Sequence, residues 1–151
     1  MEKRSLKPSS RNQSLEDKNE KLGSFLQKLI EKSREGAIIL VEGLKDAKAL
    51  RRIGITGKIS CTKNIRIPLY DYLQEYVNSK NEIIVLTDFD RRGVQLASKM
   101  TNYLEKSGKP VNIKFWLELR GFITRDIKDV EGLASYVKTI QRKCGKPVDI
   151  D

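Results

Sequence analysis

Residues 81–93 read NEIIVLTDFDRRG and form the most informative stretch of this chain. The aliphatic run at residues 83–86 is bounded by polar residues, which predicts a strand buried on both faces of a sheet. Asp88 and Asp90 follow at once, where open α/β sheets bind their ligands. Residues two apart on an extended chain point the same way, so both carboxylates can converge on one Mg²⁺. The same pattern also suits a turn or a helix N-cap.

A second motif of the same kind lies earlier in the chain. Residues 37–41, AIILV, form another buried-strand run that ends in Glu42-Gly43. The next segment, LKDAKALRRIG, has the pattern of a helix with Asp46 in its first turn. Each predicted strand therefore ends in an acid and a glycine before a helix. If the two strands are parallel, both sets of acids lie at the same edge of the sheet.

The two motifs together resemble those of the Toprim domain, which bacterial-type primases, topoisomerases and small RNA-processing nucleases share. In that family the first strand ends in Glu-Gly with an Asp three residues beyond, as Glu42 and Asp46 stand here. The second strand ends in Asp-x-Asp, followed by an Arg and a nearby Gly. The resemblance covers residues 37–137. The residues that match the second motif are Asp88, Asp90, Arg91 and Gly93.

The resemblance implies metal-dependent chemistry on phosphodiester bonds. It implies that Glu42, Asp88 and Asp90 are catalytic and hold Mg²⁺ or Mn²⁺, with Glu42 as a general acid/base or as a ligand of a second metal. A looser match to an acidic turn at residues 125–131 adds Asp129 as a further ligand, although such turns also occur as plain solvated surface. The supporting residues are Gly43, Asp46 and Gly93.

Departures from the family pattern favour its smaller members. Topoisomerases typically carry DxDREGE, whereas Arg92 and Val94 replace the glutamates here, and 151 residues leave no room for the additional domains of topoisomerases and primases. The chain thus resembles the small RNA-maturase type, which implies a nuclease that cleaves structured RNA or DNA in RNA processing or a related task. Two alternatives stay open: a non-catalytic module that binds RNA, DNA or a ribonucleoprotein, and a primase-related enzyme, which is the weaker of the two.

The composition agrees with a nucleic-acid partner. The chain has 30 Lys and Arg against 20 Asp and Glu, a net charge of +10. A protein with such a surplus of positive charge binds polyphosphate more tightly, because binding releases the counterions of the polyphosphate. The same surplus can also serve only to keep the protein soluble. Lys45, Arg91 and Arg92 are the candidate phosphate contacts, because each follows an acidic motif at the start of a predicted helix. A bare domain that lacks a substrate-gripping appendage is also expected to need a ribonucleoprotein partner or a homodimer.

Several kinds of site and location are excluded by what the sequence lacks. There is no histidine, which removes His-based zinc sites and His-dependent catalysis. Cys61 and Cys144 lack metal-ligand spacing and are interpreted as structural thiols. No apolar stretch approaches the roughly 18 residues of a membrane span, and the N-terminus has no signal-peptide core. The sequence therefore predicts a cytoplasmic protein.

The alternation of strands and helices predicts an α/β fold, with a Toprim-like (Rossmann-like), four-stranded, mainly parallel sheet flanked by helices. Residues 1–20 lack periodicity and are predicted to be a flexible basic tail, and residues 21–151 a single domain that opens with an amphipathic helix. Further strands are expected at 57–63 and 111–119, with a last helix at 132–142. The apolar face of the first helix consists of Leu22, Phe25, Leu26, Leu29 and Ile30.

Overall fold

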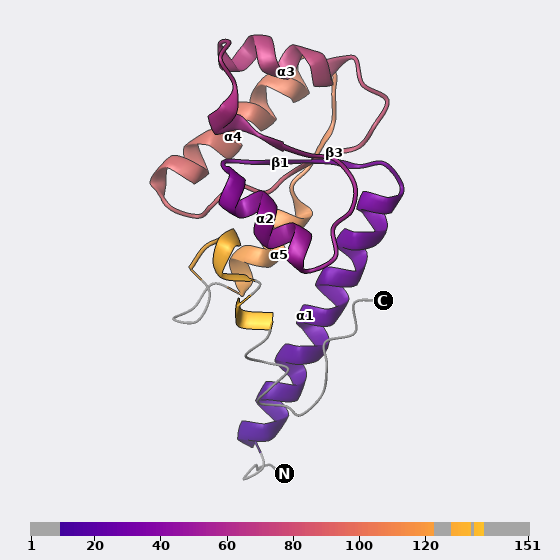
Figure 1. The fold of residues 1–151 in the computed structure, drawn as a ribbon, viewed down its shortest axis with the longest axis vertical. Helices are drawn as coiled ribbons and strands as arrows, with labels where there is room; N and C mark the ends of the chain where they lie inside the picture. The colour runs from indigo at the N-terminus through magenta and orange to yellow at the C-terminus, as the bar shows by residue number, and fades with distance from the viewer. Residues whose placement is uncertain (1–9, 123–127, 134, 138–151) are drawn as a thin grey trace, which may run out of the picture.

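The computed structural model describes residues 10–122, 128–133 and 135–137. At its centre lies a four-stranded sheet with the order β2-β1-β3-β4, in which every pair of neighbouring strands is parallel (Figure 1). The predicted α/β class and Toprim-like sheet are thereby confirmed. The strands are β1 (Ile38–Val41), β2 (Ile59–Cys61), β3 (Ile83–Val85) and β4 (Val111–Asn112).

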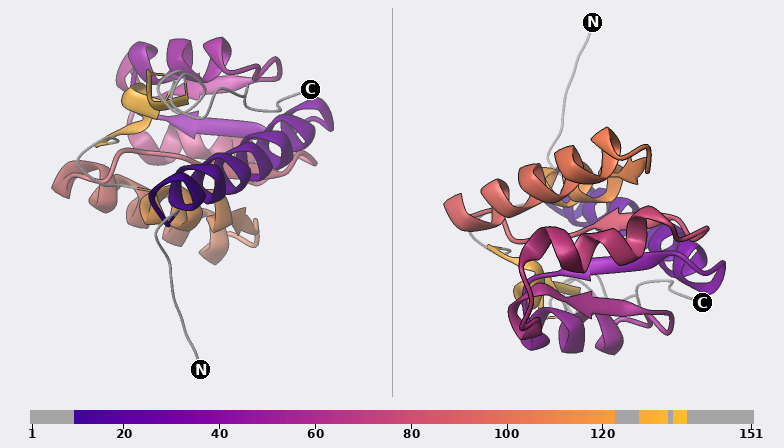
Figure 2. Two further views of the ribbon diagram at one scale, coloured as in Figure 1. Left: turned by 90° about the horizontal axis from the view of Figure 1, so that it is seen from below. Right: turned by 90° about the horizontal axis from the view of Figure 1, so that it is seen from above.

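Helices cover both faces of the sheet. The helices α3 and α4 lie side by side on one face, and α1, α2 and α5 lie on the other (Figures 1 and 2). The chain runs from β1 outward to β2, then returns across β1 to β3 and continues to β4. The strand order therefore reverses between β1 and β3, which is where sheets of this type bind ligands. The helices are α1 (Ser10–Arg34), α2 (Leu44–Arg52), α3 (Leu69–Val77), α4 (Arg91–Lys106) and α5 (Lys114–Gly121), with a 3₁₀ turn η1 at Thr62–Asn64.

The core is built from the two central strands and the helices that cover them. All residues of β1 and β3 are buried, as expected for parallel strands covered on both faces. The predicted apolar face of α1 is confirmed, because its five residues are 0–2% exposed. On this face Phe25 meets Phe115 and Phe122 edge-on, each with ring centroids 5.8 Å apart. These contacts fasten α1 to α5 beneath the sheet.

The strand predicted at residues 111–119 is wrong. β4 ends at Asn112, and α5 occupies most of the remaining segment. Phe115, Trp116 and Leu119 are buried while Leu117 is 50% exposed, which is helical spacing. The apolar residues of this segment fit a period of two and a helical period equally well. The helix prevails because it places Phe115 against α1 and Trp116 beneath the end of β3.

The N-terminal part of the chain differs from expectation, whereas the described residues near the other end agree with the predicted last helix. α1 begins at Ser10, so residues 10–20 are helical, whereas the sequence predicted no regular structure there. Helical turns appear at residues 130–133 and 135–137, whereas the rest of the predicted last helix and Cys144 lie outside the described residues. Cys61 is a half-buried free thiol. Within the described part of the chain, no helix combines the length and apolarity needed to cross a membrane.

Candidate metal and phosphate site

The carboxyl ends of β1 and β3 bring Glu42 and Asp88 together. The two strands pair in register, with Leu40 opposite Val85, so the residues that follow them emerge side by side. The backbone N–H of Asp88 donates to Glu42 Oε1 (3.1 Å), and Glu42 is only 7% exposed. Glu42 and Asp88 are thus placed side by side at the carboxyl edge of the sheet, as predicted, and their convergence on one metal stays a prediction.

Two further carboxylates complete an acid cluster, defined here as Glu42, Asp46, Asp88 and Asp129. Asp46 lies in the first turn of α2, is 6% exposed, and accepts a hydrogen bond from the backbone N–H of Gly43 (3.2 Å). Burial raises the pKa of the Asp46 carboxyl, and the charges of Glu42 and Asp129 raise it further, against the lowering effect of the Gly43 bond. The cluster thus concentrates negative charge in a partly dry site.

This concentration of negative charge contributes to a raised pKa of the Asp88 carboxyl. Burial, the largest cause, raises its pKa to about 6, and the charges of Asp46, Glu42 and Asp129 act in the same direction. The N–H of Val130 donates to Asp88 Oδ1 (3.0 Å) and opposes the rise. Burial and the neighbouring negative charges therefore both favour the protonated form of this carboxyl.

The cluster suits a magnesium or manganese ion in its chemistry. Among the described residues, no three His, Cys, Asp or Glu side chains are arranged as a complete metal site. Mg²⁺ does not require one, because it binds through one or two carboxylates and takes its other ligands from water and phosphate oxygens. The Glu42–Asp88 pair meets that requirement, and a divalent cation would neutralise the charge that raises the pKa of Asp88. These two acids are the residues that fit the metal best.

Asp90 takes the second of the two roles that its sequence position suits. It is the N-cap of α4, where its Oδ1 accepts the backbone N–H of Gly93 (2.7 Å), and the residue is exposed. An aspartate just before a helix satisfies an N–H that would otherwise lack a partner. The cap uses Oδ1, so Oδ2 is the atom left to face a metal. A ligand role for Asp90 stays a prediction.

Asp129 likewise caps a turn, because its Oδ1 accepts the N–H of Gly132 (2.7 Å).

Packing beneath the acids holds their loop in place. Gly93 lies so close to the loop that an added Cβ would stand 2.0 Å from the Asp88 carbonyl oxygen. Thr87 Oγ1 donates to the Gly93 carbonyl (2.8 Å), and Trp116 Nε1 of α5 donates to the Thr87 carbonyl (3.0 Å). The Trp116 ring also lies 5.0 Å from that of Phe89. The loop between Asp88 and Asp90 is thereby pinned to both α4 and α5.

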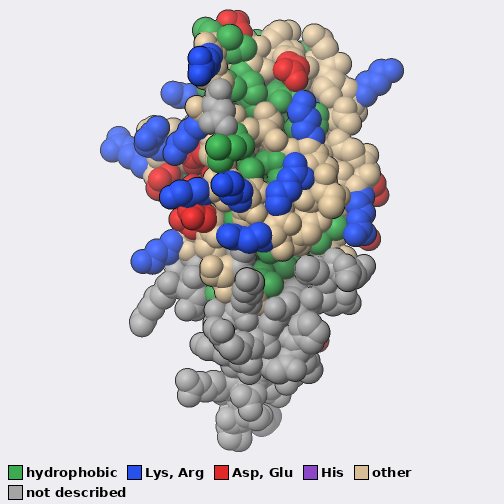
Figure 3. All heavy atoms as spheres, in the orientation of Figure 1, with side chains coloured by type: hydrophobic (Ala, Val, Ile, Leu, Met, Phe, Trp, Pro, Cys, Tyr) green, Lys and Arg blue, Asp and Glu red, His purple; other side chains and the backbone are tan. Residues whose placement is uncertain are grey.

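Basic side chains border the acids in two hollows. In the space-filling view, Lys and Arg side chains surround a group of acids at the left-hand edge, where the strands end (Figure 3). One hollow contains Lys45 and Lys63 beside Asp46 and Asp88. Arg91 is exposed at the start of α4 and lines neither hollow. The second hollow is lined by Glu42, Leu69, Arg92, Gln95, Leu96 and Lys99.

Sequence reasoning missed Lys63, Lys99 and Trp116. Lys63 follows the carboxyl end of β2, and its backbone N–H donates to the Glu42 carbonyl (2.8 Å). The rule that ligands bind at strand ends, applied to β2 as it was to β1 and β3, would have found it. Lys99 lies two turns into α4 and carries no motif. Trp116 was assigned to a strand that does not exist, so its place beneath the acid loop could not be inferred.

The pKa of Asp88 predicts that the metal-free protein becomes more stable as the pH falls from about 7.5 to about 5. The folded pKa (about 6) exceeds the ordinary value of 3.8, so the folded state binds the proton more tightly. The resulting stabilisation is fully present below the pKa that Asp88 has in the unfolded chain. It is lost as the pH rises through the pKa that Asp88 has in the folded protein. Because the carboxyl is only half buried, we expect about 1 kcal/mol, or about 3 °C in melting temperature.

Thermal melts in the presence of a chelator measure this effect. The Asp88→Asn variant should melt above the wild type at pH about 7.5 and close to it at pH about 5. Asparagine keeps an oxygen for the Val130 N–H, so the variant removes the charge without removing the bond. Parallel pH profiles for the two proteins would contradict the prediction.

Comparison with known proteins agrees with this geometry. Residues 37–116 match the Toprim domain family. A UPF0292 protein of Methanosarcina barkeri is 36% identical over 126 residues, covering 83% of this chain and 87% of its own. A UPF0292 protein of Thermococcus kodakarensis is 44% identical over 111 residues, covering 72% and 80%. A solved structure, described as a putative protein from Aquifex aeolicus, superposes with a TM-score of 0.61 at 30% identity, covering 73% of this chain and 95% of that one. With its acids at the reversal of a parallel sheet, the chain belongs to the Toprim domain family, as a small protein of the UPF0292 group.

Proposed function

We propose that this protein is a metal-dependent enzyme that cleaves phosphodiester bonds in structured RNA or DNA. The observation that supports the proposal is the meeting of Glu42 and Asp88, in which the Glu42 carboxylate accepts the backbone N–H of Asp88 at the point where the strand order reverses. Acids in such a position, with the pKa of one raised to about 6, are typical of catalytic sites. Fold alone does not specify the reaction, so the proposal rests on this site and its basic surroundings.

The residues divide into two roles. Glu42 and Asp88 would hold Mg²⁺ or Mn²⁺, which supplies charge neutralisation at the scissile phosphate and an activated water when it is bound. Lys45 and Lys63, beside Asp88, would hold the phosphate against the acids. The net charge of +10 would draw nucleic acid to the protein before these local contacts form.

A second candidate function is a binding module that holds RNA, DNA or a ribonucleoprotein without cleaving it. Two observations favour it. Asp90, the expected third acid, is engaged as a helix cap, and no complete three-acid metal site is formed by the described residues. A carboxylate pair that binds phosphate through a metal would account for the acids equally well without any turnover.

Cleavage assays distinguish the two functions. The protein is incubated with radiolabelled hairpin RNA, hairpin DNA and blunt duplex DNA in Mg²⁺, in Mn²⁺ and in EDTA. We expect cleavage of at least one structured substrate with either metal and none with EDTA. The Asp88→Asn protein, purified in parallel, controls for contaminating nucleases. Tight binding of all substrates without cleavage under any condition would favour the binding module and contradict the enzyme.

A further inference from the structure

The hollow beside Glu42 is bordered by the first two turns of α4 and by the first residue of α3. Arg92, Gln95 and Lys99 of α4 line it, and Leu69 forms its opposite wall at the start of α3. These positions recur every three or four residues, so they form one stripe along the helix. The next residue of that stripe is Tyr103. We call the surface formed by Arg92, Gln95, Lys99, Tyr103 and Tyr70 the α3–α4 strip.

The far end of the strip carries a stacked pair of aromatic rings, of which Tyr70 is exposed and Tyr103 half-buried. Tyr70 of α3 stacks on Tyr103 of α4, with ring centroids 4.8 Å apart and an angle of 25° between the ring planes. Tyr103 is anchored, because its hydroxyl donates to Gln74 Oε1 (2.7 Å). Tyr70 is 49% exposed, so its outer side is open to solvent while its inner side rests on a fixed partner. This arrangement is a rigid platform for another flat ring.

The near end of the strip carries unneutralised positive charge. Arg92 and Lys99 are exposed, and neither forms an ion pair with a described residue. Glu42 is the sole acid among the residues that line the hollow. Because Glu42 also belongs to the acid cluster, the strip begins beside that cluster. Cations followed by a stacking ring, in line and on rigid helices, are the combination that binds single-stranded nucleic acid.

The geometry favours an unpaired strand over a duplex. Arg92 and Tyr103 lie about 16 Å apart along α4 at the usual rise per residue, which is long enough for a few nucleotides. A base can stack on Tyr70 only if that face of the base is not already stacked on a neighbour, as it is inside a duplex. We infer that the α3–α4 strip binds a single-stranded segment of nucleic acid that extends from the acid cluster. This inference rests on the proposed function for its nucleic-acid substrate, and it adds an unpaired strand to that substrate.

Binding in EDTA tests the inference independently of cleavage. Radiolabelled oligo(dT), oligo(U) and a blunt duplex of the same length are measured by filter binding with wild-type, Tyr70→Ala and Tyr70→Phe proteins. We expect Tyr70→Ala to weaken binding of both oligonucleotides about tenfold, the usual consequence of losing one stacked base. Tyr70→Phe should stay within about twofold, because it keeps the ring, and duplex binding should be the same in all three proteins.

A salt series tests the cationic part of the strip. Arg92→Ala and Lys99→Ala should each lower the slope of log affinity against log salt by about 0.7 for oligo(dT). Lys114→Ala is the matched control, because Lys114 is an exposed lysine at the start of α5, in a hollow with Glu31, Glu35 and Glu82. Its slope should remain that of the wild type.

The outcomes separate the strip from the nuclease proposal. Loss of oligonucleotide binding in Tyr70→Ala supports the strip even if no substrate is ever cleaved, and the nuclease proposal then fails alone. Unchanged oligonucleotide binding in Tyr70→Ala, or an equal loss for oligonucleotide and duplex, overturns the strip even if cleavage is observed.

Discussion

Replacing Asp88 by asparagine or Glu42 by glutamine is expected to lower phosphodiester cleavage about 10³-fold. Each change keeps the side chain's size and an oxygen for its hydrogen bond, to Val130 N–H or Asp88 N–H respectively, and removes only the charge. Loss of one charged ligand weakens the hold on a metal whose stabilisation of the transition state amounts to several kcal/mol, and about 4 kcal/mol corresponds to 10³ in rate.

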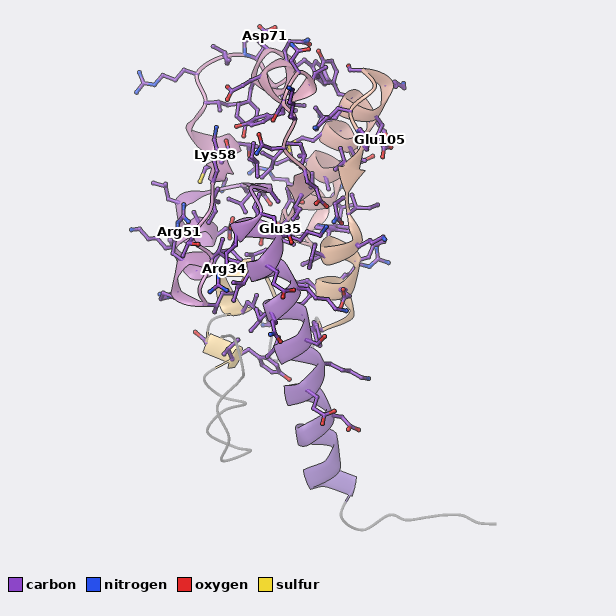
Figure 4. The ribbon with its side chains drawn as sticks, turned by 90° about the vertical axis from the view of Figure 1, so that its right-hand side faces the viewer. Arg34, Glu35, Arg51, Lys58, Asp71 and Glu105 are labelled. Carbon is purple, nitrogen blue, oxygen red and sulfur yellow. The ribbon has the colours of Figure 1, made fainter. Side chains whose placement is uncertain are left out.

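Three measurements on the same proteins make this prediction specific. Single-turnover cleavage reports the rate, filter binding in EDTA should be unchanged within about threefold, and Asp88→Asn should melt above the wild type in a chelator. A variant that is both inactive and more stable indicates a residue kept for function at a cost in stability. Glu105→Gln is the control for Glu42→Gln, because Glu105 is exposed near the end of α4, whereas the acids lie near its start (Figure 4). Cleavage by both acid variants at the wild-type rate would remove these residues from the mechanism.

Replacing Gly93 by alanine is expected to destabilise the protein by about 3 kcal/mol or more. The new methyl group would stand 2.0 Å from the Asp88 carbonyl oxygen, 2.6 Å from its carbonyl carbon and 2.9 Å from Glu42 Oε1. The nearest atoms belong to backbone, so they cannot turn aside as a flexible side chain would, and α4 must move away from β3. We expect the melting temperature to fall by about 10 °C.

Gly121→Ala provides the control for this change. Gly121 also lies in a helix, but among the described residues beyond its own helix backbone and its chain neighbours no atom stands within 4 Å of the position that its Cβ would take. There the usual preference of helices for alanine applies, and stability should stay the same or rise by up to about 1 kcal/mol. Equal effects of the two substitutions would show that helix propensity, and not the contact with the acid loop, governs Gly93.

The sequence predicted the centre of this molecule better than its periphery. The runs AIILV and EIIVL are continuous and apolar, and an acid and a glycine follow each of them, so they fitted a single arrangement of parallel strands. The segment around Phe115 and Trp116 fitted two periods, and only contact with α1 and the end of β3 decided between them. A local pattern predicted the structure correctly where it fitted only a strand. It failed where it fitted a strand and a helix equally well.

The same distinction holds for the site. Glu42 and Asp88 were predictable because each follows the end of a strand within three residues, and neighbouring parallel strands end together. The cap formed by Asp90 was one of two roles that its spacing allowed, and the N–H of Gly93 decided it. The stacking of Tyr70 on Tyr103 joins residues far apart in the sequence on two helices, so no local pattern could have indicated it.

The position of Trp116 gives the protein an intrinsic optical reporter. It is the sole tryptophan of the chain, it is 7% exposed, and it is bonded to the carbonyl of Thr87, the residue before Asp88. Its indole emission therefore originates directly beneath the acid loop. A shift of that loop would change the polarity of the ring's surroundings and its contact with Phe89. We expect metal binding at the acids to change this emission, so that it can be followed by fluorescence in the unlabelled protein.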